Sequence, residues 1–420
     1  MRLLVLGLNY APEPVGIGPY TAQMCEGLVR RGHEVAVVTA RPYYPWWQAH
    51  PDHRRRGWSR SVESGVEVTR CPHYIPARPT GARRIAHHVT FALAALPAML
   101  GAAWRRRPDV VLCVAPSLLS VAVAWLVARL SGARLWVHVQ DFEVDVAFAT
   151  GLVRSPKLAA RIAAAIESRL LRLGDRVSTI GPQMAERLVA KEVRAARVRE
   201  LRNWASAPAE VAGASDRAYR AEWRLGDAAV ALYSGNIANK QGLEVVVEAA
   251  ARLTHRDDLV FVICGDGPNR QRLEALSKGV ANVRLRALQP AERLGELLAL
   301  ARIHLLPQIA GAADLVLPSK LANMLASGRP VVATAAAGSG LAGEIAGCGI
   351  AVPPGDADAL AGAIEALLDD PAHARRLGAA GRERARERWG REAILDRLAS
   401  ELADLAAPSE QTAMLGDAAR

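Results

Sequence analysis

The sequence predicts an α/β protein built from two parallel-sheet domains of similar size. Short, continuous apolar runs alternate with helical segments along most of the 420 residues, which is typical of buried parallel strands and their crossover helices. The alternation stops once, at residues 203–216, where the chain is small, polar and without period, and then it resumes. We interpret this stretch as the linker between the domains.

The first half opens with a βαβ unit. Leu3–Leu8 is an apolar run, a loop rich in Pro and Gly follows at 9–18, and Tyr20–Arg31 has helical spacing behind Pro19, which suits a first helical turn. Gly32 can supply the left-handed residue that ends this helix. The other strands expected in this half are Val35–Ala40, Val66–Cys71, Val110–Ala115, Leu135–Val139, Val177–Ile180 and Val198–Leu201.

The second half has the same alternation. The strands expected there are Val230–Ser234, Leu259–Cys264, Val283–Leu285, Ile303–Leu306 and Pro330–Thr334. The helices expected are Gly242–Leu253, Asn269–Ser277, Ala291–Ala301, Lys320–Ser327, Asp358–Leu368 and Arg382–Leu405. The predicted domains are 1–205 and 206–387, and a disordered tail is expected at 406–420.

Val89–Trp104 is a run of 16 residues without a charge, and arginines flank it on both sides. It is shorter than the roughly 20 residues that a transmembrane helix needs, and Pro97 interrupts it, so we do not expect a membrane span. Two alternatives stay open. The segment is either a helix buried against the sheet or a helix in a bilayer interface, with its arginines at the headgroups.

Composition excludes several classes of protein. With 51% hydrophobic and 23% charged residues, the chain is neither disordered nor fibrous. The net charge of +11 is uneven, because residues 1–210 hold 29 Lys and Arg against 16 Asp and Glu. This favours contact of the first half with a polyanion or an anionic membrane, whereas a merely arginine-rich surface is the alternative. The five cysteines are far apart, which fits a reducing cytosol, and Leu3–Leu8 is too short for a signal-peptide core.

Three strand-to-helix loops have the composition of anion sites. Gly16 and Gly18 lie where glycine lets backbone N–H groups approach a phosphate, although the G-x-G-x-x-G fingerprint is absent. Lys240 lies in the loop GNIANKQG after an apolar strand, and Lys320 follows Ser319 at a helix start. A lysine in a first helical turn opposes the macrodipole, and a bound phosphate would resolve this conflict. The two cationic loops favour a nucleoside diphosphate, and a solvated loop lysine is the alternative.

Polar residues also cluster at the end of the strand 135–139. His138, Gln140, Asp141 and Glu143 fall within six residues. Ligands of open α/β sheets bind at the carboxyl ends of strands, so this cluster is a candidate functional site, with a structural role for the histidine as the alternative.

Together these motifs resemble glycosyltransferase family 4 of the GT-B fold. The C-terminal half carries YSGNIANKQGLE, CGDGP at 264–268 and PSKLANMLASGRPVVAT, and the N-terminal half carries LNYAPEPVGIGPYT, RRGHEVAVVTARPYYP and HVQDFEVD. The resemblance spans about residues 1–405. It is greatest to the subgroup that builds bacterial exopolysaccharide and O-antigen, such as the colanic acid enzymes and the N-acetyl-L-fucosamine transferases.

The resemblance implies two Rossmann-like domains facing a central cleft, and a retaining transferase that needs no metal. His138 and Asp141 would be the catalytic residues around the reacting sugar. The C-terminal helix, at about 388–405, would cross back from Trp389 onto the N-terminal domain. The residues implied around the donor are Gly16, Gly18, Asn236, Lys240, Leu288, Asp314, Ser319, Lys320, Leu321 and Asn323.

Within that set the roles differ. Lys240 and the helix start at Ser319 and Lys320 would hold the diphosphate, Gly16 and Gly18 would close over it, and Leu288 would lie near the base.

The chain departs from the family pattern in the C-terminal half. The family's Glu-x7-Glu pair falls on Leu315 and Asn323, and its usual arginine in the first loop is Asn236. Asp314 lies one residue from the first glutamate position and is a candidate substitute, and Asn323 can still hydrogen-bond a sugar hydroxyl.

The expected activity is transfer of a sugar from a nucleotide-diphosphate sugar, with UDP favoured over GDP, to a polyprenyl-diphosphate-linked glycan. The expected location is cytoplasmic, peripheral at the inner face of the plasma membrane, with the basic N-terminal domain on the anionic surface. One alternative is a non-hydrolysing nucleotide-sugar epimerase, and another is a catalytically degenerate nucleotide- or membrane-binding protein. Nucleic-acid binding is not expected, because aromatic residues are only 5% and no binding motif is present.

Overall fold

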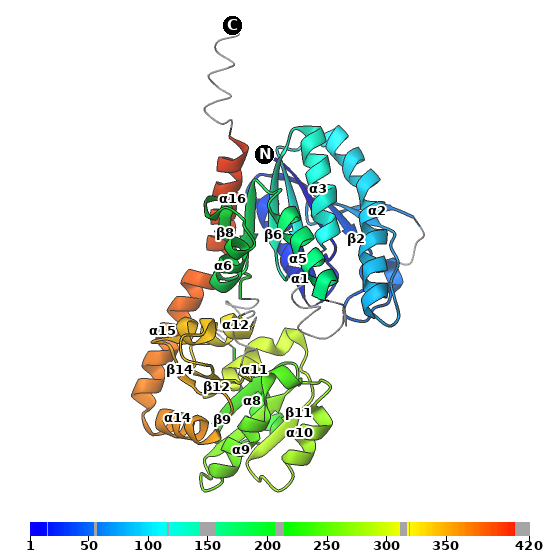
Figure 1. Ribbon diagram of the computed structural model, residues 1–420. Helices are drawn as coiled ribbons and strands as arrows, with labels where there is room; N and C mark the ends of the chain where they lie inside the picture. Colours follow the sequence, from blue (N-terminus) through cyan, green and yellow to red (C-terminus); the bar gives the residue numbers. More distant parts are fainter. Residues whose placement is uncertain are drawn as a thin grey trace. The chain divides into compact units, whose positions relative to one another are not determined.

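The computed structural model describes residues 1–407 apart from Val15, 54–56, Pro116, 143–156, 206–213, 311–316 and Ser319. The chain forms two compact units (Figure 1). Unit 1 consists of Met1–Arg202 and the residues from Glu392 onward, and unit 2 is Asn203–Arg391. The sequence predicts the domain boundaries at 205 and 387. Nearly all of the expected tail at 406–420 lies outside the described residues.

Unit 1 is built on an eight-stranded sheet with the order β3-β4-β2-β1-β5-β6-β7-β8. Neighbours are parallel except β3 and β4. The strands are β1 (Arg2–Gly7), β2 (Glu34–Ala40), β3 (Ser59–Glu63), β4 (Val66–Cys71), β5 (Val110–Ala115), β6 (Arg134–Val139), β7 (Arg176–Thr179) and β8 (Val198–Glu200). Apolar runs predict all of these but β3, which is a polar, mostly exposed edge strand.

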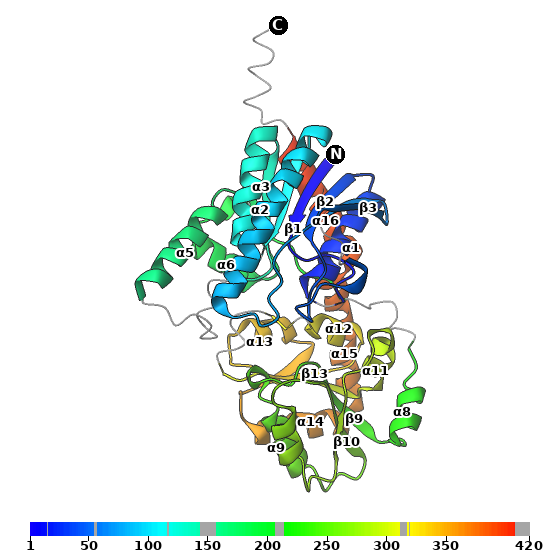
Figure 2. The same cartoon turned by 90° about the vertical axis from the view of Figure 1, so that its right-hand side faces the viewer.

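Helices cover both faces of this sheet. α2 (Gly81–Arg106), α3 (Leu118–Ser131) and α5 (Lys157–Leu171) lie in a row on one face, with α1 (Ile17–Arg30) and α16 (Arg391–Ala406) on the other (Figure 2). α1 begins before Pro19, because Gly16, at φ 78°, already ends the preceding loop. The shorter elements are η1 (Pro51–His53), α6 (Pro182–Ala190) and η2 (Ala195–Arg197).

The helix α16 packs against α1. Leu395 fills the space in which a Cβ on Gly27 would stand, so the two helices approach closely there. Arg31, at the end of α1, forms ion pairs with Glu392 (2.8 Å) and Asp396 (2.7 Å). The helix α16 is therefore an integral part of unit 1.

The helix α2 has apolar side chains on both its buried and its exposed face. Phe91 and Met99 are fully buried between the helix and the sheet. The large apolar side chains exposed on the other face are Ile85, Leu93, Leu100 and Trp104, the last 87% exposed. Among the described residues, α2 is the one helix long and apolar enough to cross a membrane by length and composition. The expected segment Val89–Trp104 is thus buried on one side and open on the other.

Unit 2 has a six-stranded, wholly parallel sheet with the order β11-β10-β9-β12-β13-β14. Its strands are β9 (Ala229–Ser234), β10 (Leu259–Cys264), β11 (Val283–Arg286), β12 (Ile303–Leu306), β13 (Val331–Thr334) and β14 (Gly349–Val352). Its helices are α8 (Arg217–Trp223), η3 (Asn239–Gln241), α9 (Glu244–Arg252), α10 (Arg270–Leu276), η4 (Ala291–Arg293), α11 (Leu294–Leu300), α12 (Lys320–Ala326), α13 (Gly340–Ile345), α14 (Ala357–Asp369) and α15 (Pro371–Trp389). The predicted fold class, two parallel α/β domains, is confirmed.

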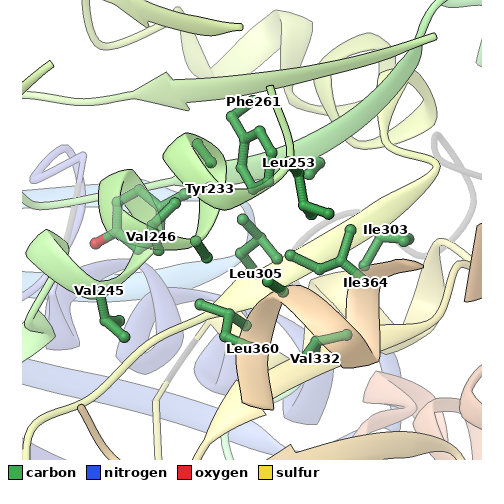
Figure 3. Close-up of a cluster of buried hydrophobic side chains, with 14 of the residues drawn as sticks. Tyr233, Val245, Val246, Leu253, Phe261, Ile303, Leu305, Val332, Leu360 and Ile364 are labelled. Carbon is green, nitrogen blue, oxygen red and sulfur yellow. The ribbon is translucent and has the colours of Figure 1, made fainter. Parts of the chain in front are cut away.

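Successive strand residues of unit 2 enter cores on opposite faces of the sheet. Tyr233 and Phe261 lie in the cluster that joins the sheet to α9 and α14 (Figure 3). Leu232 and Val262 lie in the cluster beneath α8 and α11. In Figure 3 the Tyr233 hydroxyl is at the margin of its cluster, on the side away from Ile364. The end of β9 therefore carries a polar group out of an apolar core.

The predicted helix Arg382–Leu405 is two helices. α15 begins at Pro371, α16 ends at Ala406, and Gly390 separates them. Trp389 belongs to a core cluster of unit 2, and its carbonyl accepts a hydrogen bond from the Ala205 N–H (3.1 Å). The chain therefore returns to unit 1 only after Arg391.

Candidate active site

The strand order of unit 2 changes direction between β9 and β12. From β9 the sheet continues to β10 and β11, and from β12 it continues to β13 and β14. At such a point the loops that follow the two strands diverge and leave room for a ligand at the carboxyl ends. The loop after β9 begins at Gly235, and the segment after β12 leads to Lys320. Two of the predicted anion-binding loops therefore follow the two neighbouring strands at this point of the sheet.

Glycines bring the loops after β9 and β10 into close contact. The Gly235 N–H donates to the Cys264 carbonyl (2.9 Å), which extends the ladder past the strand ends. A Cβ on Gly265 or on Gly267 would overlap the backbone of residues 235–237. Gly235 and Gly267 also have φ values of 146° and 153°, which favour glycine. The glycines of the CGDGP motif are thus required by backbone packing.

Lys320 extends its ammonium group over the end of β9. Its Nζ donates to the Tyr233 Oη (2.9 Å) and lies 4.1 Å from the centroid of that ring. The same Nζ lies 2.6 Å from where a Cβ on Gly235 would stand, so only glycine leaves room for the lysine. The Tyr233 hydroxyl donates in turn to the Asn236 carbonyl (2.6 Å). A positive charge is thereby held at the topological switch point.

Other predicted donor residues of unit 2 lie near the same edge of the sheet. Asn236 is exposed in the loop after β9, and Lys240 lies in η3. Leu288 is 64% exposed after β11, two strands away from β9. In α12, Leu321 is buried in the core, whereas Asn323 is half-buried.

Two predicted residues and one predicted side chain fall outside the part of the chain that the structure describes. Asp314 and Ser319 lie outside the described residues, as does the side chain of Lys240. Leu315, which stands where the family has its first glutamate, also falls there.

In unit 1, a buried carboxylate organises the glycine loop after β1. Glu13 is 3% exposed, and its Oε1 accepts the backbone N–H groups of Tyr43 (3.0 Å) and Tyr44 (3.1 Å). Its side chain also packs against Gly18, and the Tyr44 ring packs against Gly16. Burial raises the pKa of Glu13, and the N–H donors oppose this rise. The loops after β1 and β2 are thus joined at the carboxyl edge of the sheet.

His138 and Asp141 have different environments. His138 is buried in β6, with Nδ1 2.9 Å from the Ser178 Oγ and Nε2 2.9 Å from the amide nitrogen of Gln140. Burial lowers the pKa of His138 to about 4, so its ring is neutral at pH 7. Asp141 is exposed beyond the strand end. Of the two side chains, that of the aspartate is open to solvent and that of the histidine is not.

Tyr233 and Glu13 are site residues that the sequence does not reveal. Tyr233 reads as the apolar end of a strand, and Glu13 as a charge in a proline-rich loop. The available signal for Tyr233 is its position directly before the GN turn after an apolar strand. The described residues include no group of three or more His, Cys, Asp or Glu that could hold a metal ion.

Two family models match the chain, one in each unit. Residues 15–204 match the glycosyl transferase 4-like domain, and residues 228–370 match the glycosyl transferases group 1 domain. The chain is 40% identical over 386 residues to the colanic acid biosynthesis glycosyl transferase WcaI of Escherichia coli, covering 89% of this chain and 93% of that protein. It is also 36% identical over 166 residues to the alpha-D-kanosaminyltransferase of Streptomyces kanamyceticus, covering 38% and 42% of the two chains.

Solved structures share the fold at low sequence identity. Sucrose-phosphate synthase from Thermosynechococcus elongatus aligns with a TM-score of 0.71 at 20% identity, over 97% of this chain and 100% of that one. HepE from Anabaena, in complex with UDP, aligns with a TM-score of 0.66 at 14% identity, over 96% and 100%. The chain therefore belongs to the family of glycosyltransferases that join a glycosyl transferase 4-like domain to a group 1 domain, and it is a glycosyltransferase of the GT-B fold.

Proposed function

We propose that this glycosyltransferase moves a sugar from a UDP-sugar to a lipid-linked glycan in exopolysaccharide synthesis of the colanic acid type. The observation that carries the donor class is the Lys320 ammonium group, held beside Gly235 at the switch point of unit 2. A fixed cation among backbone loops suits the diphosphate of a nucleotide-sugar. HepE, which shares the fold, is described in complex with UDP, which supports a nucleotide-sugar donor.

In the proposed reaction, breaking the glycosidic bond leaves negative charge on the departing nucleoside diphosphate. Lys320, together with Lys240, would stabilise this charge without a metal ion, and Gly16 and Gly18 would contribute backbone N–H groups to the same diphosphate. Leu288 would lie near the base. Ser319 and Asp314 remain proposed donor contacts, as do Asn236, Leu321 and Asn323.

We assign the reacting sugar to His138 and Asp141, with retention of anomeric configuration. Asp141 is exposed, so it could contact the sugar directly. The Nε2 of His138 is engaged with Gln140, so a contact from the histidine would require that Gln140 release it. Asp141→Ala and His138→Ala should therefore lower turnover while leaving UDP binding within about twofold of the wild-type value.

The proposed acceptor is a glycan on a polyprenyl diphosphate at the inner face of the plasma membrane. The apolar face of α2, with Leu93 and Trp104 exposed, supports contact with the bilayer interface. Arg105 and Arg106 in the last turn of that helix would lie at anionic headgroups. Leu93→Glu should release the protein from vesicles that contain phosphatidylglycerol, as measured by flotation.

The donor assignment is tested by thermal-shift titration of the wild-type protein with UDP, GDP, CMP, UMP and NAD, with and without EDTA. A ligand at 100 times its Kd stabilises the native state by about 2.7 kcal/mol. We expect a saturating shift with UDP that EDTA does not change. Lys320→Ala should weaken UDP binding at least tenfold, about 1.4 kcal/mol, because it removes the charged hydrogen-bond donor.

Lys278→Ala is the matched control, since Lys278 is an exposed lysine of the same unit and its loss changes the net charge equally. Equal UDP affinities for the two variants would overturn the role of Lys320. A UDP shift without turnover of any UDP-sugar would identify the catalytically degenerate alternative, because family glutamates are replaced at Leu315 and Asn323.

A further inference from the structure

The loop that follows β2 is unusually aromatic and is closed on itself. Residues 42–50, hereafter the aromatic loop, read PYYPWWQAH and hold two tyrosines and two tryptophans. The His50 N–H donates to the Pro42 carbonyl (2.9 Å), so the two ends of the loop meet. Compact loops of this kind, packed by their own side chains, are frequently functional. Because β2 is parallel to β1, the loop lies at the same sheet edge as the glycine loop.

The base of the aromatic loop, at Tyr43 and Tyr44, is held by buried contacts. The Tyr43 ring is buried and packs against His87 (4.6 Å between ring centroids) and His73 (5.5 Å). Burial lowers the pKa of both histidines, to about 4 and about 3, so this base is uncharged at neutral pH. The Glu13 carboxylate holds the backbone of the loop through two N–H groups. The base of the loop is therefore held both by a buried ring cluster and by a carboxylate.

The middle of the loop, at Trp46 and Trp47, has one side chain exposed to solvent and one packed inward. Trp47 has φ 51°, a strained value for a bulky residue, and its ring packs inward on Tyr43 (5.3 Å). Its neighbour Trp46 is 62% exposed. The loop therefore presents an exposed indole directly beside a ring that is packed inward.

We infer that the aromatic loop is a subsite for a sugar ring of the acceptor, with Trp46 and Tyr44 as its stacking surface; this rests on the proposed function. A pyranose has one face of C–H groups, which packs on an aromatic ring, and a rim of hydroxyls that needs polar partners. Trp46 supplies the exposed ring. Tyr44, half-buried against Gly16, supplies a second ring beside the glycine loop, and Gln48 offers an exposed amide.

The composition of the loop favours a sugar over a lipid surface. Residues 42–50 contain no Lys, Arg, Asp or Glu, and no aliphatic side chain larger than alanine apart from the prolines. Arg41, directly before the loop, donates to the Gly57 carbonyl (3.1 Å). A bilayer anchor usually combines aliphatic residues with basic ones, which α2 has and this loop lacks.

The binding test uses saturation-transfer NMR on the full-length protein with the methyl glycosides of glucose, galactose, fucose and N-acetylglucosamine. We expect at least one of them to receive saturation from the wild-type protein. Trp46→Ala should weaken this binding at least tenfold, whereas Trp46→Phe should retain part of it because a ring remains. Trp58→Ala is the matched control, since Trp58 is another exposed tryptophan of the same unit that lies outside the loop.

No saturation transfer to any of the four glycosides, or equal losses in Trp46→Ala and Trp58→Ala, would overturn the inference. It would also fail if Trp46→Ala kept sugar binding but lost flotation with phosphatidylglycerol vesicles, because the loop would then be a membrane anchor. Thermal shift by UDP is measured on the same samples. An absent UDP shift in the wild-type protein counts against the proposed donor, while the glycoside result still decides the subsite.

Discussion

At the scale of single residues, the arrangement around Lys320 combines a charge with the means to hold it. A lysine in the first turn of α12 faces the positive end of a helix, which costs electrostatic free energy. The face of the Tyr233 ring and the Tyr233 oxygen both attract the ammonium group, and Gly235 leaves the space that it occupies. These contacts position the side chain over the end of β9.

Tyr233→Phe tests whether that positioning matters. The ring and its packing stay, but the oxygen that accepts from Lys320 and donates to the Asn236 carbonyl is lost. A hydrogen bond to a charged group contributes about 1.5–3 kcal/mol, so UDP affinity should fall by about tenfold or more in isothermal titration calorimetry. Tyr74→Phe, in unit 1, is the control. Unchanged UDP affinity in Tyr233→Phe would mean that the tyrosine only fills the core.

The sequence predicts that Lys320 is a candidate anion-binding residue, but it does not predict the contact between Lys320 and Tyr233. The reason is the distance between the two residues along the chain. The conflict between a lysine and a helix start is visible within a few residues. Tyr233 comes from a strand 87 residues earlier. A contact of that separation depends on strand order, which composition and periodicity do not specify.

At the scale of elements, the C-terminal helix α16 shows how one missing side chain sets a packing distance. Gly27 has negative φ within α1, so its need for glycine comes from Leu395 rather than from backbone conformation. Close approach then lets Arg31 reach Glu392 and Asp396. These pairs are partly exposed and contribute modestly, so apolar packing holds the helix in place.

Gly27→Ala should therefore destabilise unit 1. The added methyl group would overlap Leu395, and overpacking of a core typically costs about 1–3 kcal/mol. The midpoint of urea unfolding, followed by circular dichroism, should fall. Gly101→Ala in α2 is the control, because its Cβ would meet only the end of the Arg105 side chain, at 3.4 Å. This variant should gain up to about 1 kcal/mol of stability from the higher helix propensity of alanine. Equal midpoints for the two variants would contradict the packing argument.

Element prediction from the sequence succeeds where burial is complete and fails at edges and breaks. β1, β10 and β12 are continuous apolar runs with buried residues, and each is predicted. β3 is polar because it lies at a sheet edge, and β14 is likewise an edge strand, with only its last residue buried.

The break at Gly390 is missed for a different reason. Gly378 and Gly381 precede it in the same Ala- and Arg-rich run, yet both lie inside α15. There they allow close contact with Gly328 and Leu325, so a glycine in this run marks packing at two positions and a helix end at the third.

At the scale of the whole molecule, buried histidines are divided unequally between the units. Burial lowers the pKa of His73 to about 3 and of His87 and His138 to about 4, all in unit 1. In unit 2 it lowers the pKa of His304 to about 3. These imidazoles are neutral because the fold buries them, His138 and His304 on the strands β6 and β12, and His73 and His87 beside the Tyr43 ring. No motif in the sequence predicts this burial. A histidine such as His138, at the end of an apolar strand, is as typical of a ligand-binding residue as of a buried one.

This division predicts that acid destabilises unit 1 before unit 2. Below about pH 6.5 an unfolded histidine takes up a proton, whereas these native ones do so only near pH 3–4. The stability they confer is therefore complete above pH 6.5 and is lost as the pH falls. The slope is about 1.4 kcal/mol per pH unit for each histidine, or roughly 4 kcal/mol in unit 1 against about 1.4 in unit 2. The raised pKa of Glu13 opposes this loss, but for one group only.

Hydrogen exchange measured by mass spectrometry at pH 7 and pH 5, corrected for intrinsic exchange rates, separates the two units within one sample. Peptides from β1 and β5 should lose protection between these pH values by more than peptides from β9 and β12. His304→Gln serves as the internal comparison, since it should flatten the smaller slope of unit 2 and leave unit 1 unchanged. Equal losses of protection in the two sheets would mean that the buried histidines of unit 1 become protonated without unfolding it, and that the acid response belongs to the carboxylates instead.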